Sequence, residues 1–151
     1  SSNMSANTTL RLANDFENII AIKEASGDME QIMQILRDKP TSFKVLSGDD
    51  ALTLPMLFMG AEGVISVQAM AMPKEFSEMV RQGLLGNIEK ARALHYSQLE
   101  VIDHIFAEGN PAGVKACLNI NGICEEYVRL PLTCISRTRY NQLKDLLTNR
   151  N

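Results

Sequence analysis

The chain has 151 residues, of which 45% are hydrophobic, and a formal net charge of −3. This is the composition of an ordinary globular protein with one core, and its acidic balance argues against a nucleic-acid-binding protein. No apolar run approaches the ~20 residues of a transmembrane helix, and the polar first residues are unlike a signal peptide, so we expect a cytoplasmic protein with no membrane partner. The cysteine spacing matches neither a redox pair nor a zinc site, so we expect no metal.

The first elements are predicted to be a helix and then a strand. Ser5 suits an N-cap, and the apolar residues after it have the spacing of a short amphipathic helix. The run Asn18-Ile19-Ile20-Ala21-Ile22-Lys23 predicts a strand over residues 18–23. Because its apolar residues do not alternate with polar ones, we expect both faces of this strand to be buried, as in a parallel sheet covered by helices.

Two further strands are predicted, each after a helix. A helix capped by Asp28 should stop at Lys39-Pro40, because proline disfavours a helical residue before it. The next elements are predicted as a strand over residues 43–47, a helix from Gly48-Asp49-Asp50 to Gly60, and a strand over residues 63–67. Strands that alternate with helices in this way form parallel sheets with right-handed crossovers.

The carboxyl half has no comparable strand pattern and is predicted to be a helical appendage. Its helices are expected over residues 73–80, 84–106, 111–120 and 138–147. His95 and His104 fall on opposite faces of one of these helices, so they cannot share a metal, and each is expected at the surface. Arg137 and Arg139 are expected on a solvated face.

Lys23 is the candidate catalytic residue, because it ends the first strand. The carboxyl ends of parallel strands meet at one edge of a sheet, where ligands bind in α/β folds. A lysine at this edge can attack a carbonyl as a neutral amine, and apolar neighbours such as Ile20 and Ile22 favour the neutral form. The alternative is a surface lysine whose stem lies along the end of the strand.

Gly48 falls near the same edge of the predicted sheet. A keto acid bound at Lys23 needs a partner for its carboxylate, and backbone amides at a glycine turn before a helix are suited to this role. The alternative is a glycine required only by a tight turn. Asp49 and Asp50 are explained by helix capping, so we assign them no catalysis.

Four segments, in this order and spacing, resemble the dihydrodipicolinate synthase family of pyruvate-dependent lyases, a superfamily that includes N-acetylneuraminate lyase. They are Ile-Ala-Ile-Lys-Glu-Ala-Ser-Gly-Asp at 20–28, Leu-Ser-Gly-Asp-Asp at 46–50, Gly-Val-Ile-Ser-Val at 63–67 and Asn-Pro-x-x-Val-Lys at 110–115. The residues after the lysine favour the synthase branch over the sialic acid branch. The resemblance runs through essentially the whole chain but matches only the carboxyl-terminal half of the family.

The resemblance implies an α/β fold: the last three βα units of a (β/α)8 TIM barrel over residues 1–82 and a carboxyl-terminal helical extension over residues 83–151. It implies that Lys23 forms a Schiff base with pyruvate, that Gly48 helps to hold the pyruvate carboxylate region, and that the backbone carbonyl of Ile65 contacts the lysine amine. The covalent imine takes the place of a cofactor. The enamine would then add to aspartate semialdehyde, in lysine and diaminopimelate biosynthesis.

The resemblance also implies partners for this chain. A complete barrel has eight strands and typically ~250 residues, whereas three strands are predicted here. We therefore expect activity to require the missing amino-terminal half, and the family resemblance implies a homotetramer with Ser26, Met29 and Met59 near one contact. Two alternatives stay open: a related pyruvate or 2-keto acid aldolase or lyase, and a catalytically inert half-barrel that acts as an assembly module.

Overall fold

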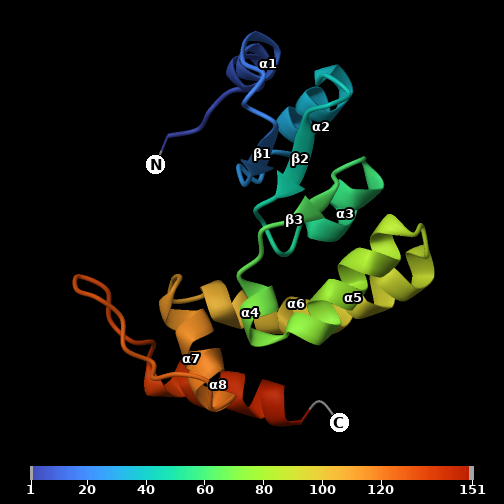
Figure 1. Ribbon diagram of the computed structural model, residues 1–151. Helices are drawn as coiled ribbons and strands as arrows, with labels where there is room; N and C mark the ends of the chain where they lie inside the picture. Colours follow the sequence, from blue (N-terminus) through green and yellow to red (C-terminus); the bar gives the residue numbers. More distant parts are fainter. Residues whose placement is uncertain (1, 150–151) are drawn as a thin grey trace. The chain divides into compact units, whose positions relative to one another are not determined.

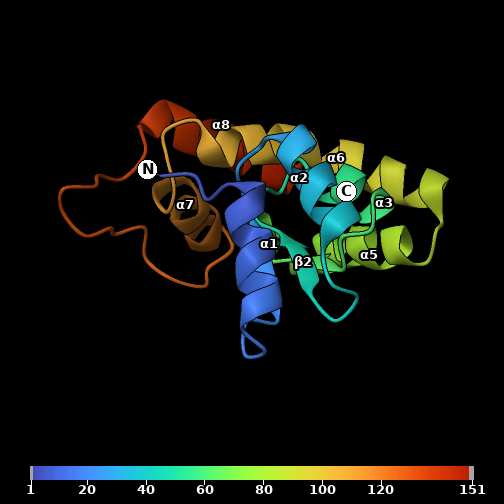
Figure 2. The same ribbon diagram turned by 90° about the horizontal axis from the view of Figure 1, so that it is seen from above.

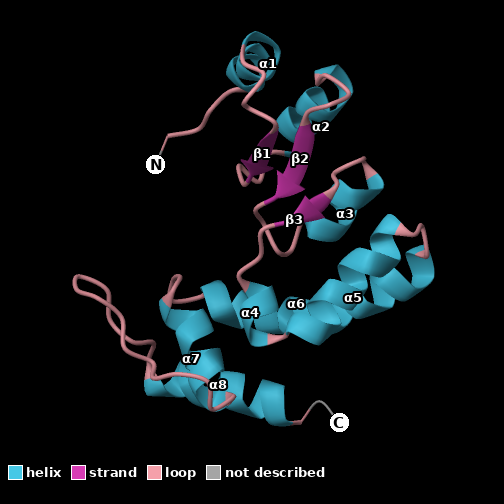
Figure 3. Cartoon of the chain, in the orientation of Figure 1, coloured by secondary structure: helices cyan, strands magenta, loops and turns pink. Residues whose placement is uncertain are grey.

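The computed structural model describes residues 2–149, which form helices and one three-stranded sheet (Figure 1; Figure 3). In chain order the elements are α1 (Ala6–Asp15), β1 (Ala21–Glu24), α2 (Met29–Asp38), β2 (Lys44–Ser47), α3 (Thr53–Phe58), β3 (Gly63–Val64), α4 (Gln68–Ala71), α5 (Pro73–Leu84), α6 (Ile88–Phe106), α7 (Ala112–Ile120) and α8 (Arg137–Thr148). Within the described chain, no helix is both long and apolar enough to cross a membrane.

The described residues pack into two compact units. Unit 1 consists of residues 2–66 and 79–91, and unit 2 consists of residues 67–78 and 92–149. Each unit has its own hydrophobic core. The predicted boundary after residue 82, which refers to the complete barrel, stays a prediction.

The sheet of unit 1 has the predicted serial arrangement, with strand order β1-β2-β3 and parallel pairing throughout. Lys23 pairs with Leu46, and Leu46 pairs with Gly63, so these three residues share one face of the sheet. The strands are shorter than predicted, because β1 begins at Ala21 and β3 ends at Val64. Both are edge strands with a hydrogen-bonded neighbour on one side only, so the ladder extends less far along them.

Helices cover one face of this sheet. α1 and α2 lie side by side (Figure 1; Figure 2), and the core on this face joins α1, α2, β2 and α3 through Ala6, Ile32, Ile35, Val45 and Met56. Within unit 1, no hydrophobic core forms on the face that carries Lys23, and Ile65 next to β3 is 51% exposed. The predicted burial of the first strand on both faces is therefore wrong for this chain, and Ile20 is 68% exposed.

The predicted helix caps of α1 and α2 are confirmed. The Ser5 hydroxyl accepts a hydrogen bond from the Thr8 amide, and the Asp28 carboxylate accepts from two amides in the first turn of α2. The expected helix start near Asp49 is wrong, because α3 begins at Thr53. Asp49 instead accepts the Leu52 amide at 3.1 Å and closes the turn that precedes the helix.

The helices of the carboxyl half differ from the prediction in two places. The helix expected over residues 84–106 begins only at Ile88, and the helix expected over residues 73–80 continues to Leu84, because Gly86 with its positive φ of 75° separates α5 from α6. The short helix α4 was not predicted. In unit 2, α7 approaches α6 so closely that a Cβ on Gly113 would lie 1.9 Å from the carbonyl oxygen of Ile105. Only glycine fits this contact.

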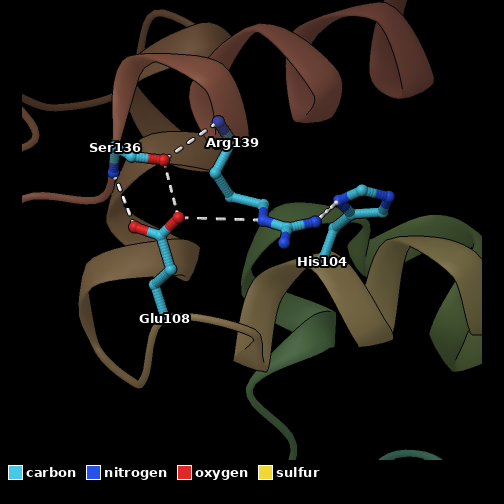
Figure 4. Close-up of polar contacts among 4 residues, drawn as sticks. All are labelled: His104, Glu108, Ser136 and Arg139. Atoms are coloured by element: carbon cyan, nitrogen blue, oxygen red, sulfur yellow. Dashed lines mark hydrogen bonds and ion pairs between the residues drawn. The ribbon is translucent and has the colours of Figure 1, made fainter.

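Two expectations for unit 2 are wrong, because tertiary packing determines how exposed the two side chains are. His95 is only 6% exposed, and burial lowers the pKa of its imidazole. Arg139 is not on a solvated face, because its guanidinium donates to Nδ1 of His104 at 2.6 Å and lies 3.9 Å from the Glu108 carboxylate (Figure 4). Since the guanidinium can only donate, Nδ1 of His104 is the acceptor in this hydrogen bond.

Glu108 in the same cluster anchors the start of α8. Its two oxygens accept the hydroxyl and the amide of Ser136, both at 2.6 Å, and Ser136 is the N-cap of α8 (Figure 4). These two bonds from Ser136, with a smaller contribution from Arg139, lower the pKa of Glu108 below its ordinary value of 4.5. The ionised carboxylate therefore stabilises this part of unit 2.

We expect Glu108→Gln to lower the free energy of unfolding at neutral pH. Because the carboxyl group has a lower pKa when folded, its contribution is present above 4.5 and is lost as the pH falls through the folded pKa. Urea unfolding at about pH 7 and about pH 3 would show a smaller difference between wild type and variant at the lower pH. Glu125→Gln, at an exposed loop position, is the control; a pH-independent difference for Glu108→Gln would contradict this account.

Candidate active site

Lys23 occupies the second-last position of β1, at the carboxyl edge of the sheet. The pleat of the strand directs Lys23 and Glu24 to opposite faces, so the lysine is exposed whereas Glu24 is 4% exposed. Within residues 2–149 the lysine amine has no hydrogen bond and no ion pair. The amine is therefore free to meet a ligand on the open face of the sheet.

The apolar surroundings predicted for this amine are not present in the described chain. Ile20 is largely exposed to solvent, and Ile22 packs against the core on the opposite, helix-covered face. The apolar neighbours that the sequence predicted around Lys23 are therefore not packed around it in unit 1.

Gly48 lies directly against the stem of Lys23. A Cβ at this position would lie 2.8 Å from Cε of Lys23 and 2.6 Å from Cβ of Ala25, closer than side-chain carbons approach. The φ angle of Gly48 is not positive, so a left-handed turn does not explain the glycine. The close approach of the lysine explains it.

The backbone amides of this turn are already bonded. Gly48 N–H donates to the carbonyl of Glu24 at 2.7 Å, and Asp49 N–H donates to the hydroxyl of Ser47 at 3.2 Å. The expected carboxylate cradle at these amides is therefore not available in this structure. What Gly48 provides is room for the lysine stem.

Ile65 follows β3 and continues the ladder that holds these residues together. Its amide donates to the carbonyl of Ser47 at 2.9 Å. Lys23, Gly48 and Ile65 thus lie along one edge of the sheet, on three neighbouring chain segments. In the described chain the carbonyl of Ile65 does not contact the lysine amine, and that role stays a prediction.

Ser47 and Thr53 fix the turn that carries Gly48, and sequence reasoning missed them. The buried hydroxyls of Ser47 and Thr53 lie 3.1 Å apart, and each donates to the carbonyl of Asp49 at 2.8 Å. These bonds hold the backbone of residues 47–53 in one shape. The sequence did carry an indication of this turn: a serine ends an apolar strand, and a second hydroxyl residue follows just inside a helix.

Glu24 is the second residue that sequence reasoning missed. Its buried carboxylate accepts the Ser26 amide at 2.7 Å and the side-chain amide of Gln31 at 3.2 Å. The sequence did carry an indication of this role, because a charged residue stands at the end of an apolar strand, directly before turn residues. The bonds hold the turn over residues 24–28 that leaves β1 beside the lysine.

An open hollow of about 620 Å³ lies beside Lys23 in unit 1, which is ample for a small keto acid. Its lining comes from the segment before α1 and from the end of β1 with its turn: Ser2, Asn3, Met4, Ile22, Lys23, Glu24, Ala25, Ser26 and Asp28. No cluster of His, Cys, Asp or Glu in residues 2–149 could hold a metal ion. The arrangement offers a free amine in a polar, open site, which suits covalent capture of a carbonyl compound.

Comparison with known proteins identifies relatives along nearly the whole chain. A model of the dihydrodipicolinate synthetase family matches residues 1–150. The chain is 47% identical over 145 residues to 4-hydroxy-tetrahydrodipicolinate synthase of Parabacteroides distasonis, covering 96% of this chain and 49% of the relative. It is 50% identical over 149 residues to the enzyme of the same name from Flavobacterium psychrophilum, covering 99% and 50%.

Solved structures give the same correspondence. The dihydrodipicolinate synthase of Aquifex aeolicus superimposes with a TM-score of 0.92 at 43% identity, over 96% of this chain and 50% of its own. The enzyme from Thermotoga maritima gives a TM-score of 0.94 at 35% identity, over 97% and 51%. The chain therefore spans about half the length of the proteins that it matches.

Proposed function

The chain belongs to the dihydrodipicolinate synthetase family, and on this premise we propose that it is the carboxyl-terminal half of an enzyme that condenses pyruvate with aspartate semialdehyde through a Schiff base on Lys23. Its three βα units and the helices after them are the carboxyl-terminal part of a TIM barrel and its helical extension. The product would be 4-hydroxy-tetrahydrodipicolinate, the compound in the names of the relatives, for lysine and diaminopimelate biosynthesis.

One observation supports the role of Lys23 above all others: an unpaired amine stands over a glycine on the open face of the sheet. As a neutral amine it attacks the ketone carbon of pyruvate, and loss of water gives the imine. The imine nitrogen withdraws electrons, so a proton can leave the pyruvate methyl group. The resulting enamine carbon attacks the aldehyde of the second substrate.

The missing amino-terminal half is the partner that this mechanism requires. Within unit 1, the face of the sheet that carries Lys23 is not covered by a helix, and both edge strands have a hydrogen-bonded neighbour on one side only. Exposed strand edges and apolar residues on one face favour association with further chain. We propose that this half closes the barrel and desolvates the lysine, and that residues 1–151 alone do not turn over substrate.

We propose that the completed protein is a homotetramer, with α2 and α3 at one contact between subunits. Met33 on α2 and Phe58 on α3 are both large apolar side chains exposed in unit 1. Apolar side chains at such positions suit an interface between subunits. Met33 shares α2 with Met29, and Phe58 directly precedes Met59, two of the residues near which the family resemblance put a contact.

Complementation tests the proposed function. The chain would be co-expressed with the amino-terminal half of the relative from Parabacteroides distasonis, which is 47% identical over the shared part. We expect the chain alone to be inactive and the complex to condense pyruvate with aspartate semialdehyde. Turnover only with sugar-acid aldehydes would favour a related aldolase, and a folded complex without any turnover would favour an inert assembly module.

A further inference from the structure

The buried carboxylate of Glu24 begins a chain of side-chain hydrogen bonds that leads away from Lys23. One carboxylate oxygen accepts the Ser26 amide, and the other accepts Nε2 of Gln31 at 3.2 Å. Gln31 lies in the first turn of α2, where the Asp28 carboxylate also accepts its backbone amide at 3.1 Å. The side chain of Gln31 therefore has little freedom on the side that faces β1.

Gln31 extends this chain to Asn3, in the segment before α1. Oε1 of Gln31 accepts from Nδ2 of Asn3 at 2.8 Å, and Nε2 of Gln31 lies 3.4 Å from Oδ1 of Asn3. Because a carboxylate can only accept, Nε2 of Gln31 must face Glu24, and this choice fixes the orientation of both amides. The three side chains thus form one ordered connection.

This connection joins the two sides of the hollow beside Lys23. One side is the segment of residues 2–4, and the other is the end of β1 with its turn. Asn3 and Met4 are exposed, and their backbones have no hydrogen bond to another backbone group in the described chain. The bonds between the side chains of Gln31 and Asn3 therefore hold this segment in place.

We propose that Gln31 is a positioning residue for the Lys23 site, which holds residues 2–4 as a wall of the hollow and so sets how tightly a small keto acid is retained next to the amine. This inference rests on the proposed function for the identity of the ligand. The hydrogen-bonded wall itself does not depend on it. Gln31 does not contact the reacting atoms, so its effect should appear in substrate retention and not in the chemical step.

The same helix supplies a matched control. Gln34, one turn further along α2, donates to Oδ1 of Asn7 in α1 at 3.4 Å. This is also a glutamine-to-asparagine bond between α2 and the amino-terminal segment, but neither residue lines the hollow. Gln31→Leu and Gln34→Leu therefore each remove a glutamine-to-asparagine bond, but only the bond of Gln31 reaches a residue that lines the hollow.

The first test measures the backbone motion of Asn3 and Met4 by NMR relaxation on the purified chain. We expect their order parameters to fall from about 0.8 to below about 0.6 in Gln31→Leu and to stay unchanged in Gln34→Leu. In the complemented protein, KM for pyruvate should rise about fivefold in Gln31→Leu with kcat within about twofold. Unchanged order parameters and KM in Gln31→Leu, or equal changes in Gln34→Leu, would overturn the proposal.

An exchange of the two partners provides a rescue experiment. Gln31→Glu alone places a second carboxylate next to that of Glu24, and the two repel each other. We expect it to lower the order parameters of residues 3 and 4 at least as much as Gln31→Leu does. Glu24→Gln combined with Gln31→Glu restores an amide donor opposite a carboxylate, so order parameters and KM should return toward wild type. If the double variant does not recover the wild-type order parameters and KM, Gln31 is not a positioning residue. If the wild-type complex forms no imine with pyruvate, the proposed function fails, while the relaxation data still decide whether Gln31 holds the wall.

Discussion

Lys23→Ala is expected to lower kcat/KM for condensation in the complemented protein by at least about 10³-fold. The substitution removes the amine that would form the imine, and residues 2–149 offer no second amine on the open face at this edge of the sheet. Steady-state kinetics with pyruvate and aspartate semialdehyde measure the effect. Far-ultraviolet circular dichroism should show an intact fold, because the side chain is exposed and makes no hydrogen bond in the described chain.

Lys44→Ala is the matched control for this prediction. Lys44 is also an exposed strand lysine, but it lies at the start of β2 and binds Glu62 at 2.6 Å. Losing such a surface ion pair costs about 0 to 1 kcal/mol, so activity should stay close to wild type. Full activity in Lys23→Ala, or an equal loss in both variants, would exclude Lys23 as the nucleophile.

Gly48→Ala is expected to reduce imine formation about a hundredfold and to lower the free energy of unfolding by about 1 to 3 kcal/mol. The new Cβ would lie 2.6 Å from Cβ of Ala25, which cannot rotate away, and 2.8 Å from Cε of Lys23. Relief of these contacts requires a backbone shift and a new path for the lysine stem. Urea unfolding and the rate of reductive trapping with pyruvate measure the two effects.

Gly63→Ala is the control for the glycine prediction. Gly63 is on the neighbouring strand β3 and also has no positive φ, but its Cβ would lie 3.4 Å from the nearest atom, Cδ2 of Leu46. This is close to an ordinary van der Waals contact, so the variant should lose less than about 1 kcal/mol and keep imine formation. If Gly48→Ala behaves like Gly63→Ala, the close packing of lysine on glycine is not important for the site.

Local patterns were sufficient to predict the order of elements and several of their ends. A capping carboxylate at Asp28, a proline after Lys39 and an apolar run before Lys23 act over a few residues, so the sequence carries them directly. The parallel sheet follows from the alternation of strands and helices. The edge that brings Lys23 and Gly48 together could therefore be predicted before the structure was known.

Tertiary relationships could not be predicted in this way. Burial of Ile20 was expected because an apolar run describes the strand in a complete barrel, whereas the helices of unit 1 cover only one face of the sheet. The connection from Glu24 through Gln31 to Asn3 joins positions up to 28 residues apart, and polar residues with no periodic pattern give no indication of such a pairing. The same holds for Arg139, which meets His104 across unit 2.

Reductive trapping tests most directly whether Lys23 forms the Schiff base. The complemented protein would be treated with pyruvate and borohydride, digested, and mapped by mass spectrometry. We expect one pyruvate adduct, on the peptide that contains Lys23, and no adduct in Lys23→Ala. An adduct on another lysine, or none on the folded and complemented protein, would contradict the assignment of Lys23 as the Schiff-base residue.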